Sequence, residues 1–154
     1  MIELITIANV AVLGVFAGSM LTEAFLLVPF FQSLNAKDFY ILHHDFGPRL
    51  YRYYAPITVT ATLVPMLTAG AVTVTDAGHS WLFWLTVIIS LTILSTYFFY
   101  FRKANLAFAE KRVSLADLEL ELTRWSHVHK FRTTLALVSF LVSIFAALSV
   151  CQGR

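Results

Sequence analysis

Four apolar segments, each long enough to cross a lipid bilayer, account for most of this chain. They cover residues 4–31, 55–74, 80–101 and 133–150, and a membrane-spanning helix needs about 20 such residues. Hydrophobic residues make up 58% of the 154 residues and charged residues only 13%, whereas soluble domains average about 45–50% and about 25%. A soluble protein of this size cannot bury so much apolar surface. We therefore predict an all-α integral membrane four-helix bundle that forms a single domain over residues 1–154.

The distribution of lysine and arginine predicts the orientation of the four spans. The connectors between spans one and two and between spans three and four carry ten basic residues, which are Lys37, Arg49, Arg52, Arg102, Lys103, Lys111, Arg112, Arg124, Lys130 and Arg132. The opposite side has only Arg154. Because basic connectors stay in the cytoplasm, we predict that both termini lie outside and that spans three and four are joined by a long cytoplasmic helical connector. We expect the host to be a bacterial inner (cytoplasmic) membrane.

Charge and cysteine content exclude two classes of function. A net charge of +2 argues against nucleic acid as a partner, because nucleic-acid-binding domains carry clustered positive charge. The single cysteine, Cys151, excludes an internal disulfide and a C-x-x-C redox pair. The partners that we expect are the lipid bilayer and a lipophilic small molecule. Homo-oligomers and partners in a larger membrane complex stay open.

The last connector and the fourth span are predicted to form one long helix. Ser114-x-x-Asp117 resembles a capping box, and no helix breaker precedes the fourth span. One face of this helix carries a stripe at alternating spacings of four and three, formed by Leu118, Leu122, Trp125, His129 and Arg132. The stripe is either an interfacial anchor in the lipid headgroups or a buried site with an aromatic wall, a base and a cation.

Glu23 lies in the middle of the first apolar segment, where no water can solvate a carboxylate. An ionisable residue inside a span normally faces the bundle interior and has a partner. Its depth is one that Arg132 or His129 could reach from the fourth span, so we predict a Glu23–Arg132 or Glu23–His129 pair. Such a pair either serves chemistry or only fixes the register of the helices.

A metal site is the weaker interpretation of the same polar residues. His43 or His44, Asp45, His127 or His129, and Glu23 could converge from three segments. No local spacing resembles a ligand pair such as H-x-x-x-H or E-x-x-H. We therefore predict no metal ligands and require no cofactor, and we leave haem and copper open.

The segment "RWSHVHKFRTTLALVSF" resembles a known family of small membrane proteins. Its W-x-x-x-H-x-x-R core, formed by Trp125, His129 and Arg132, is similar to the fourth-span signature of the anthrone oxygenase-like family. Many members of that family are four-span proteins of unknown function. "AGSMLTEAFLLVPFFQSL" resembles the first span of the family, and "FGPRLYRYYAPITVTATLV" resembles its entry into span two. The resemblance covers about residues 14 to 140.

Two further positions compare less directly with the family. Asn105 matches an asparagine after span three, although Lys103 and Ala104 stand here where the family usually has Pro-Thr. Glu23 departs from the family pattern, in which a frequent acid falls about one turn later, at the position of Leu27 here. The resemblance therefore transfers Trp125, His129, Arg132 and Asn105, while Glu23 comes from its position in the span.

The resemblance implies that a polycyclic anthrone is oxidised by molecular oxygen to an anthraquinone. On this hypothesis the catalytic residues are His129, Arg132 and Glu23, and the substrate-binding residues are Trp125 and Asn105. His129 or Glu23 would remove a ring-methylene proton, Arg132 would stabilise the developing oxyanion, and Trp125 would stack on the flat ring.

A second hypothesis comes from a different class of protein. The chain could be a non-catalytic subunit of a larger membrane complex that contacts a haem, a pigment or a quinone held by its neighbours. A transporter has little support, because the sequence shows no inverted repeat and no ionisable residues along the outer half of the spans.

Overall fold

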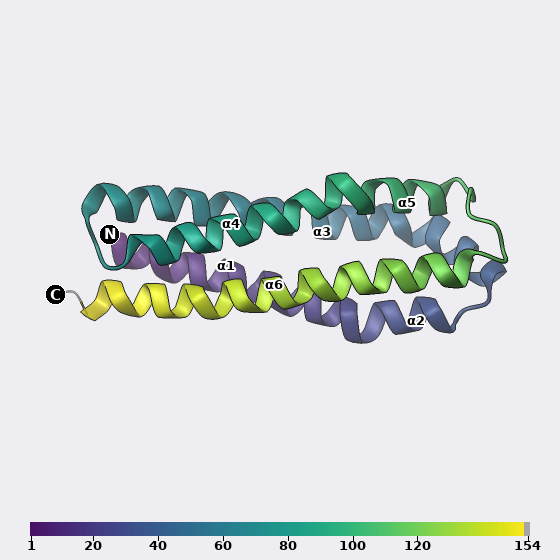
Figure 1. Ribbon diagram of the computed structural model, residues 1–154, viewed down its shortest axis with the longest axis horizontal. Coiled ribbons are helices and arrows are strands. Elements are labelled where there is room, and N and C mark those ends of the chain that lie inside the picture. The colour runs from purple at the N-terminus through teal and green to yellow at the C-terminus, as the bar shows by residue number, and fades with distance from the viewer. Residues whose placement is uncertain (153–154) are drawn as a thin grey trace.

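The computed structural model describes residues 1–152, and this part of the chain is helical without a strand. Four long helical rods lie side by side (Figure 1). The first rod consists of α1 (Ile2–Thr22), η1 (Glu23–Leu27) and α2 (Val28–Ser33), and the second is α3 (Ala36–Thr75). The third rod consists of α4 (Ser80–Thr96), η2 (Tyr97–Phe101) and α5 (Arg102–Ala109). The fourth rod is α6 (Leu118–Gln152). Each rod is long and apolar enough to cross a membrane. The predicted all-α class is confirmed, as are four helices long and apolar enough to span a membrane.

The rods surround a common core in which each contacts two neighbours. α1 packs on α6 and α3, and α4 packs on α6 and α3. The N-terminus and the end of α6 lie at the same end of the bundle (Figure 1). The turn between α3 and α4 meets α6 there, because the His79 N–H donates to Ser149 Oγ at 3.0 Å. Gly78 has a positive φ of 63°, and a Cβ at this position would lie 2.8 Å from Ser149 Oγ. Only glycine fits both the backbone conformation and this close approach.

The helices extend well beyond the predicted apolar segments at the opposite end of the bundle. α3 begins at Ala36, so that only residues 34–35 separate it from α2, and residues 110–117 are the loop between α5 and α6. The predicted helical connector is thus made of the ends of α5 and α6 rather than of a separate helix. A buried cluster that includes Phe39, Phe108 and Leu122 holds these extensions together.

Polar caps fix where two of these helices begin. Asn35 precedes α3, and its Oδ1 accepts a hydrogen bond from the Asp38 N–H at 3.0 Å. At the predicted box before the fourth rod, the Asp117 N–H donates to Ser114 Oγ at 3.2 Å, and the Ser114 hydroxyl donates to Asp117 Oδ2. Regular α-helix begins only at Leu118, directly after that box. Side-chain oxygens thus satisfy backbone donors that have no partner inside the helix.

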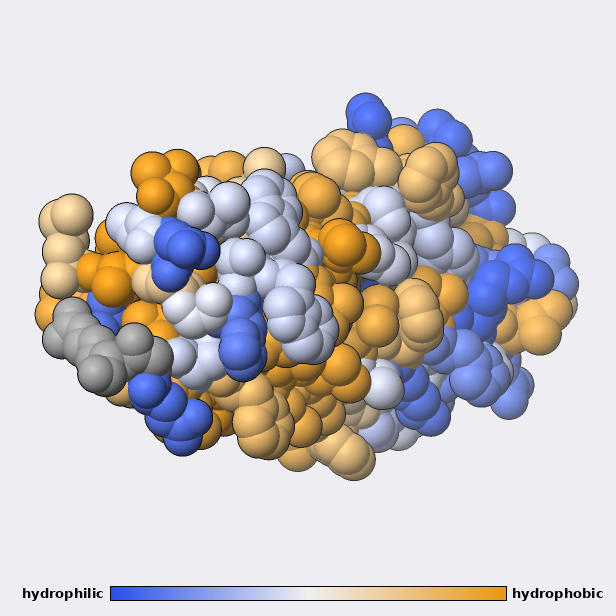
Figure 2. Space-filling view, turned by 60° about the vertical axis from the view of Figure 1, so that its left-hand side comes forward, coloured by the Kyte–Doolittle hydropathy of each residue, from blue (hydrophilic) through white to orange (hydrophobic). Residues whose placement is uncertain are grey.

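Apolar side chains cover the middle of the molecule, and hydrophilic side chains gather toward its ends (Figure 2). Large exposed apolar residues come from all four rods, among them Leu4, Leu67, Ile88 and Phe145. Surface of this kind is unfavourable in water, so the apolar helices indicate contact with a bilayer. Arg154, the one basic residue expected on the outer side, lies outside the described residues. The orientation in the membrane stays a prediction.

The exposed thiol of Cys151 tests the predicted orientation, since it lies near the end of α6, at the same end of the bundle as the N-terminus. We expect a membrane-impermeant maleimide to label Cys151 in intact cells. As the control, Cys151→Ser combined with Leu115→Cys places the thiol in the exposed loop at the opposite end, and it should react only after permeabilisation. The reverse pattern would show that the termini are cytoplasmic.

Candidate functional site

The predicted stripe on α6 points into the bundle. Trp125, His129 and Arg132 are buried, with exposed fractions of 7%, 0% and 8%. Their spacing of four and three residues keeps them on one helical face, and that face packs against the first and third rods. An anchor in the headgroups would leave the indole and the guanidinium exposed, so the interfacial-anchor interpretation is wrong.

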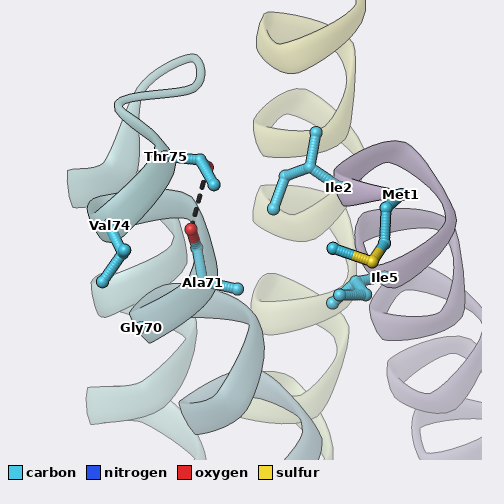
Figure 3. Close-up of a pocket in the computed structure, with 7 residues that line it drawn as sticks. All are labelled: Met1, Ile2, Ile5, Gly70, Ala71, Val74 and Thr75. Carbon is cyan, nitrogen blue, oxygen red and sulfur yellow. Dashed lines mark hydrogen bonds between the residues drawn. The ribbon is translucent and has the colours of Figure 1, made fainter.

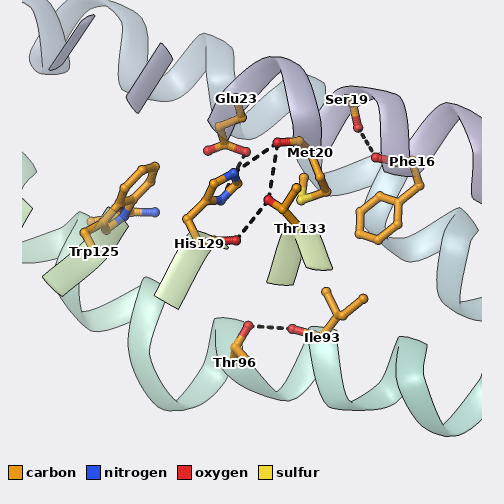
Figure 4. A network of polar contacts seen from close by, with 10 residues as sticks. Phe16, Ser19, Met20, Glu23, Ile93, Thr96, Trp125, His129 and Thr133 are labelled. Carbon is orange, nitrogen blue, oxygen red and sulfur yellow. Dashed lines mark hydrogen bonds and ion pairs between the residues drawn. The ribbon is translucent and has the colours of Figure 1, made fainter. Parts of the chain in front are cut away.

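Glu23 and His129 meet across the interface between the first and fourth rods (Figure 4). Glu23 is 8% exposed, and its Oε2 lies 3.7 Å from His129 Nδ1. The other ring nitrogen, Nε2, lies 3.2 Å from the Met20 carbonyl oxygen. Because a carbonyl only accepts, Nε2 carries a proton, and Nδ1 is the nitrogen that faces the carboxyl group. The predicted pair forms with His129.

No hydrogen bond joins the Glu23 carboxyl to the His129 imidazole in this contact. A separation of 3.7 Å exceeds hydrogen-bond length, and among residues 1–152 Nδ1 has no hydrogen-bond partner. Thr133 supports the arrangement, since its hydroxyl lies 3.0 Å from the His129 carbonyl and 3.4 Å from that of Met20. A modest shift of either side chain would let one proton pass between the carboxyl and the imidazole.

Arg132 lies against an aromatic ring instead of a carboxylate. Its Cζ is 4.5 Å from the centre of the Phe101 ring, which is a cation–π distance. Arg132 and Glu23 interact electrostatically, but within the described part of the chain the side chain that contacts Glu23 is His129. The buried Arg132 Nε has no hydrogen-bond partner among residues 1–152, so one guanidinium donor remains available to an acceptor.

Trp125 forms an aromatic wall behind the imidazole. Its ring stacks on His129 with centroids 5.4 Å apart and planes 9° apart, and Phe101 meets it edge-on at 5.5 Å. The indole Nε1–H donates to Asn105 Oδ1 at 3.2 Å. Asn105 therefore contacts the site through Trp125, and its amide oxygen fixes the orientation of the indole.

Two π-helical turns border the site, one on each of the rods that face α6. Glu23 is the first residue of η1, and Phe101 is the last residue of η2. A π turn carries one extra residue, which rotates the side chains that follow it, and such turns are frequent at functional sites. The turns therefore help to set which side chain of each rod faces α6.

Sequence reasoning missed two residues of the site. Phe101 belongs to the aromatic run "YFFYF", and within η2 it is the residue that is buried. Tyr54 packs against the apolar cluster that contains Met20 and interacts electrostatically with Glu23. A run of aromatic residues gives no signal of which ring turns inward.

The remaining predicted polar residues do not converge on this site. His43 packs between the rings of Phe39 and Phe108, whereas His44 pairs with Asp45 at 3.0 Å on the surface. His127 is exposed. Within residues 1–152, no three His, Cys, Asp or Glu side chains are grouped so that they could hold a metal ion.

Two apolar hollows open between α1 and α3, away from the polar cluster. The first, of about 500 Å³, lies at the N-terminal end of α1, where Ile2 and Ile5 face Ala71 and Val74 (Figure 3). The second, of about 330 Å³, lies nearer the middle of the bundle. Neither Glu23 nor His129 lines either hollow.

Comparison with known proteins leaves the family open. No protein-family model, no curated protein and no solved structure matches this chain. The resemblance to the anthrone oxygenase-like family therefore remains a hypothesis.

The contact between Glu23 and His129 predicts non-additive stability effects. We expect Glu23→Gln or His129→Gln to lower the free energy of unfolding by about 1–3 kcal/mol, because each removes one side of the buried contact between the carboxyl and the imidazole. The double variant should cost less than the sum, with a coupling of about 0.5–3 kcal/mol. Denaturation of the purified protein in detergent measures this cycle. Glu119→Gln, on the exposed start of α6, is the matched control, and additive effects would show that the two side chains are not coupled.

Proposed function

We propose that this protein is an integral membrane enzyme that oxidises a lipophilic aromatic substrate with molecular oxygen, in the manner implied by its resemblance to the anthrone oxygenase-like family. One observation carries the proposal: the hydrogen-bond-free His129 Nδ1 faces the Glu23 carboxyl in a buried site beside the Arg132 guanidinium. We further propose that this site lies in the cytoplasmic half of a bacterial inner membrane, with both termini outside.

The chemistry begins with removal of a proton. The methylene group of an anthrone is acidic because the resulting anion is delocalised onto the ring oxygen. The Glu23–His129 pair accepts this proton, and the Arg132 guanidinium stabilises the developing negative charge in a site that excludes water. A purely structural ion pair would not require an imidazole nitrogen that lacks a hydrogen-bond partner.

Oxygen supplies both the oxidant and the new oxygen atom. The anion reacts with dioxygen at the former methylene carbon, and protonation by the Glu23–His129 pair gives a hydroperoxide. Loss of the second hydrogen from that carbon, together with cleavage of the O–O bond, forms the new carbonyl and releases water. One anthrone and one dioxygen thus give one anthraquinone and one water, so the electrons balance without another reductant.

The second candidate function is a non-catalytic subunit of a larger membrane complex. The two apolar hollows between α1 and α3 favour it, because a neighbouring helix or a pigment could fill them. Turnover by the isolated chain separates the two candidates, since a subunit that only packs against a complex would show none.

Oxygen consumption by the purified protein in lipid nanodiscs, with anthrone as substrate, tests the proposal. We expect Arg132→Gln to lower kcat/KM by about 100-fold or more, because a buried donor to the developing oxyanion is lost, and His129→Gln to lower it by a similar factor through loss of the base. Lys130→Gln lies on the exposed face of α6 and should leave the rate unchanged. A wild-type rate no faster than spontaneous autoxidation would contradict the proposal, as would full activity in both site variants.

A further inference from the structure

A layer of buried polar side chains separates two apolar clusters of the core. One cluster contains Leu13 of α1 and Ala136 of α6, and the other, nearer the end of α6, contains Ala146 and packs against Ile2. Between the two clusters, every buried residue of α1 and of α6 carries a hydroxyl or an amide group. The members of this polar layer are Thr6 and Asn9 on α1, Thr86 and Ser90 on α4, and Ser139 and Ser143 on α6, all at most 3% exposed.

The register of α1 against α6 places the layer at two adjacent levels. The two helices run in opposite directions, and Glu23 meets His129 across their interface. Asn9 precedes Glu23 by fourteen residues, and Ser143 follows His129 by fourteen residues. Because both helices rise by the same distance per residue, Asn9 and Ser143 lie at the same depth. Ser139 lies one turn deeper, on the same face of α6 as Ser143.

α4 contributes to the deeper of these levels. The His79 N–H, just before α4, bonds to Ser149 of α6. Ser90 lies eleven residues after His79, and Ser139 lies ten residues before Ser149. The two serines are therefore level with each other, and both are buried in the core that α4 and α6 share.

The polar groups of the layer differ in their hydrogen bonds. Three hydroxyls donate to a carbonyl of their own helix, namely those of Thr6, Thr86 and Ser143. Both side-chain amide atoms of Asn9, and the hydroxyls of Ser90 and Ser139, have no hydrogen-bond partner among residues 1–152. Buried groups of this kind are costly inside a membrane, where neither lipid nor bulk water can bond to them.

We infer that the polar layer binds buried water, which bridges α1, α4 and α6. The side-chain amide of Asn9 requires both an acceptor and a donor, and a water molecule supplies both. One helical turn rises by about 5.4 Å, which is close to two hydrogen bonds of about 2.8 Å in series. A single water between the two levels can therefore bond to Asn9 and to Ser139 together.

This water site is separate from the candidate functional site and from lipid. The bundle encloses every member of the layer, and none of them lines either apolar hollow. Buried Leu13, Phe16 and Met20 lie between the layer and Glu23 along α1, so the inference does not rest on the proposed function. The bridged layer fixes the depth of α1 against α6, which is the register that brings Glu23 to His129.

A crystal structure of the protein grown from a lipidic mesophase tests this inference directly. We expect density for ordered water within hydrogen-bond distance of the Asn9 side-chain amide and of the Ser139 or Ser143 hydroxyl. The map must also show ordered water at the ends of the bundle. In Asn9→Leu, where leucine keeps the branched shape of asparagine without its polar atoms, this density should be lost. An Asn9 amide that bonds directly to another residue, or that has no water beside it in such a map, would overturn the inference.

A double-variant cycle tests whether water couples two side chains that do not bond to each other. We expect Ser139→Ala to lower the midpoint of denaturation in detergent, and to lower it about twofold less in the Asn9→Leu background, because the shared water is already displaced there. Ser95→Ala is the matched control, since the Ser95 hydroxyl bonds to the Thr92 carbonyl outside the layer. Its effect should be the same in both backgrounds.

Two outcomes of this cycle contradict the water site. The first is an equal effect of Ser139→Ala in both backgrounds. The second is a higher midpoint in Asn9→Leu than in the wild type, because removal of an amide that truly lacks a partner is stabilising. If Asn9→Leu does not fold, Ser90→Ala replaces it in the same cycle with Ser139→Ala, and additive effects of these two changes count equally against the inference.

Discussion

Hydrocarbon cannot solvate a charged or strongly polar side chain, and this constraint governs the arrangement of the bundle. Glu23 and His129, together with Arg132, lie within helices long and apolar enough to cross a membrane. Their stability there depends on one another. The Glu23–His129 contact and the position of Arg132 on the Phe101 ring meet that need with groups from three rods. The cluster therefore ties the first, third and fourth rods together at one depth, and any chemistry at this depth uses groups that also hold the fold.

Hydroxyl groups elsewhere in the core form hydrogen bonds within their own helix. Thr6, Thr86 and Ser143 each donate to a carbonyl of their own helix at 2.6–2.8 Å, so they need no partner from another rod. Asn9 differs from these hydroxyl residues, because its side chain is fully buried and both of its amide atoms lack a hydrogen-bond partner among residues 1–152. The cross-helix polar contacts of the core thus concentrate at the candidate site, where side chains from three rods meet.

Within the site, two planar groups and two π turns hold the reactive atoms. The stacked pair of Trp125 and His129 limits rotation of the imidazole, and the hydrogen bond to Met20 fixes which nitrogen faces Glu23. Glu23 begins η1 and Phe101 ends η2, and both side chains lie on the side of their rods that faces α6. Such preorganisation suits proton transfer and stabilisation of a developing charge, since neither group must be reoriented during the reaction.

The sequence by itself determined the class of fold, the four apolar helices, the shared helical face of the stripe on α6 and the need of Glu23 for a partner. These follow from local quantities, namely the length of each apolar segment, the helical period and the cost of a charge in lipid. Only the tertiary structure decided that the stripe on α6 points into the bundle, that His129 rather than Arg132 contacts Glu23, and that Phe101 and Tyr54 join the site. These features depend on the register between helices, which packing and the two π turns set, and no local pattern in the sequence encodes that register.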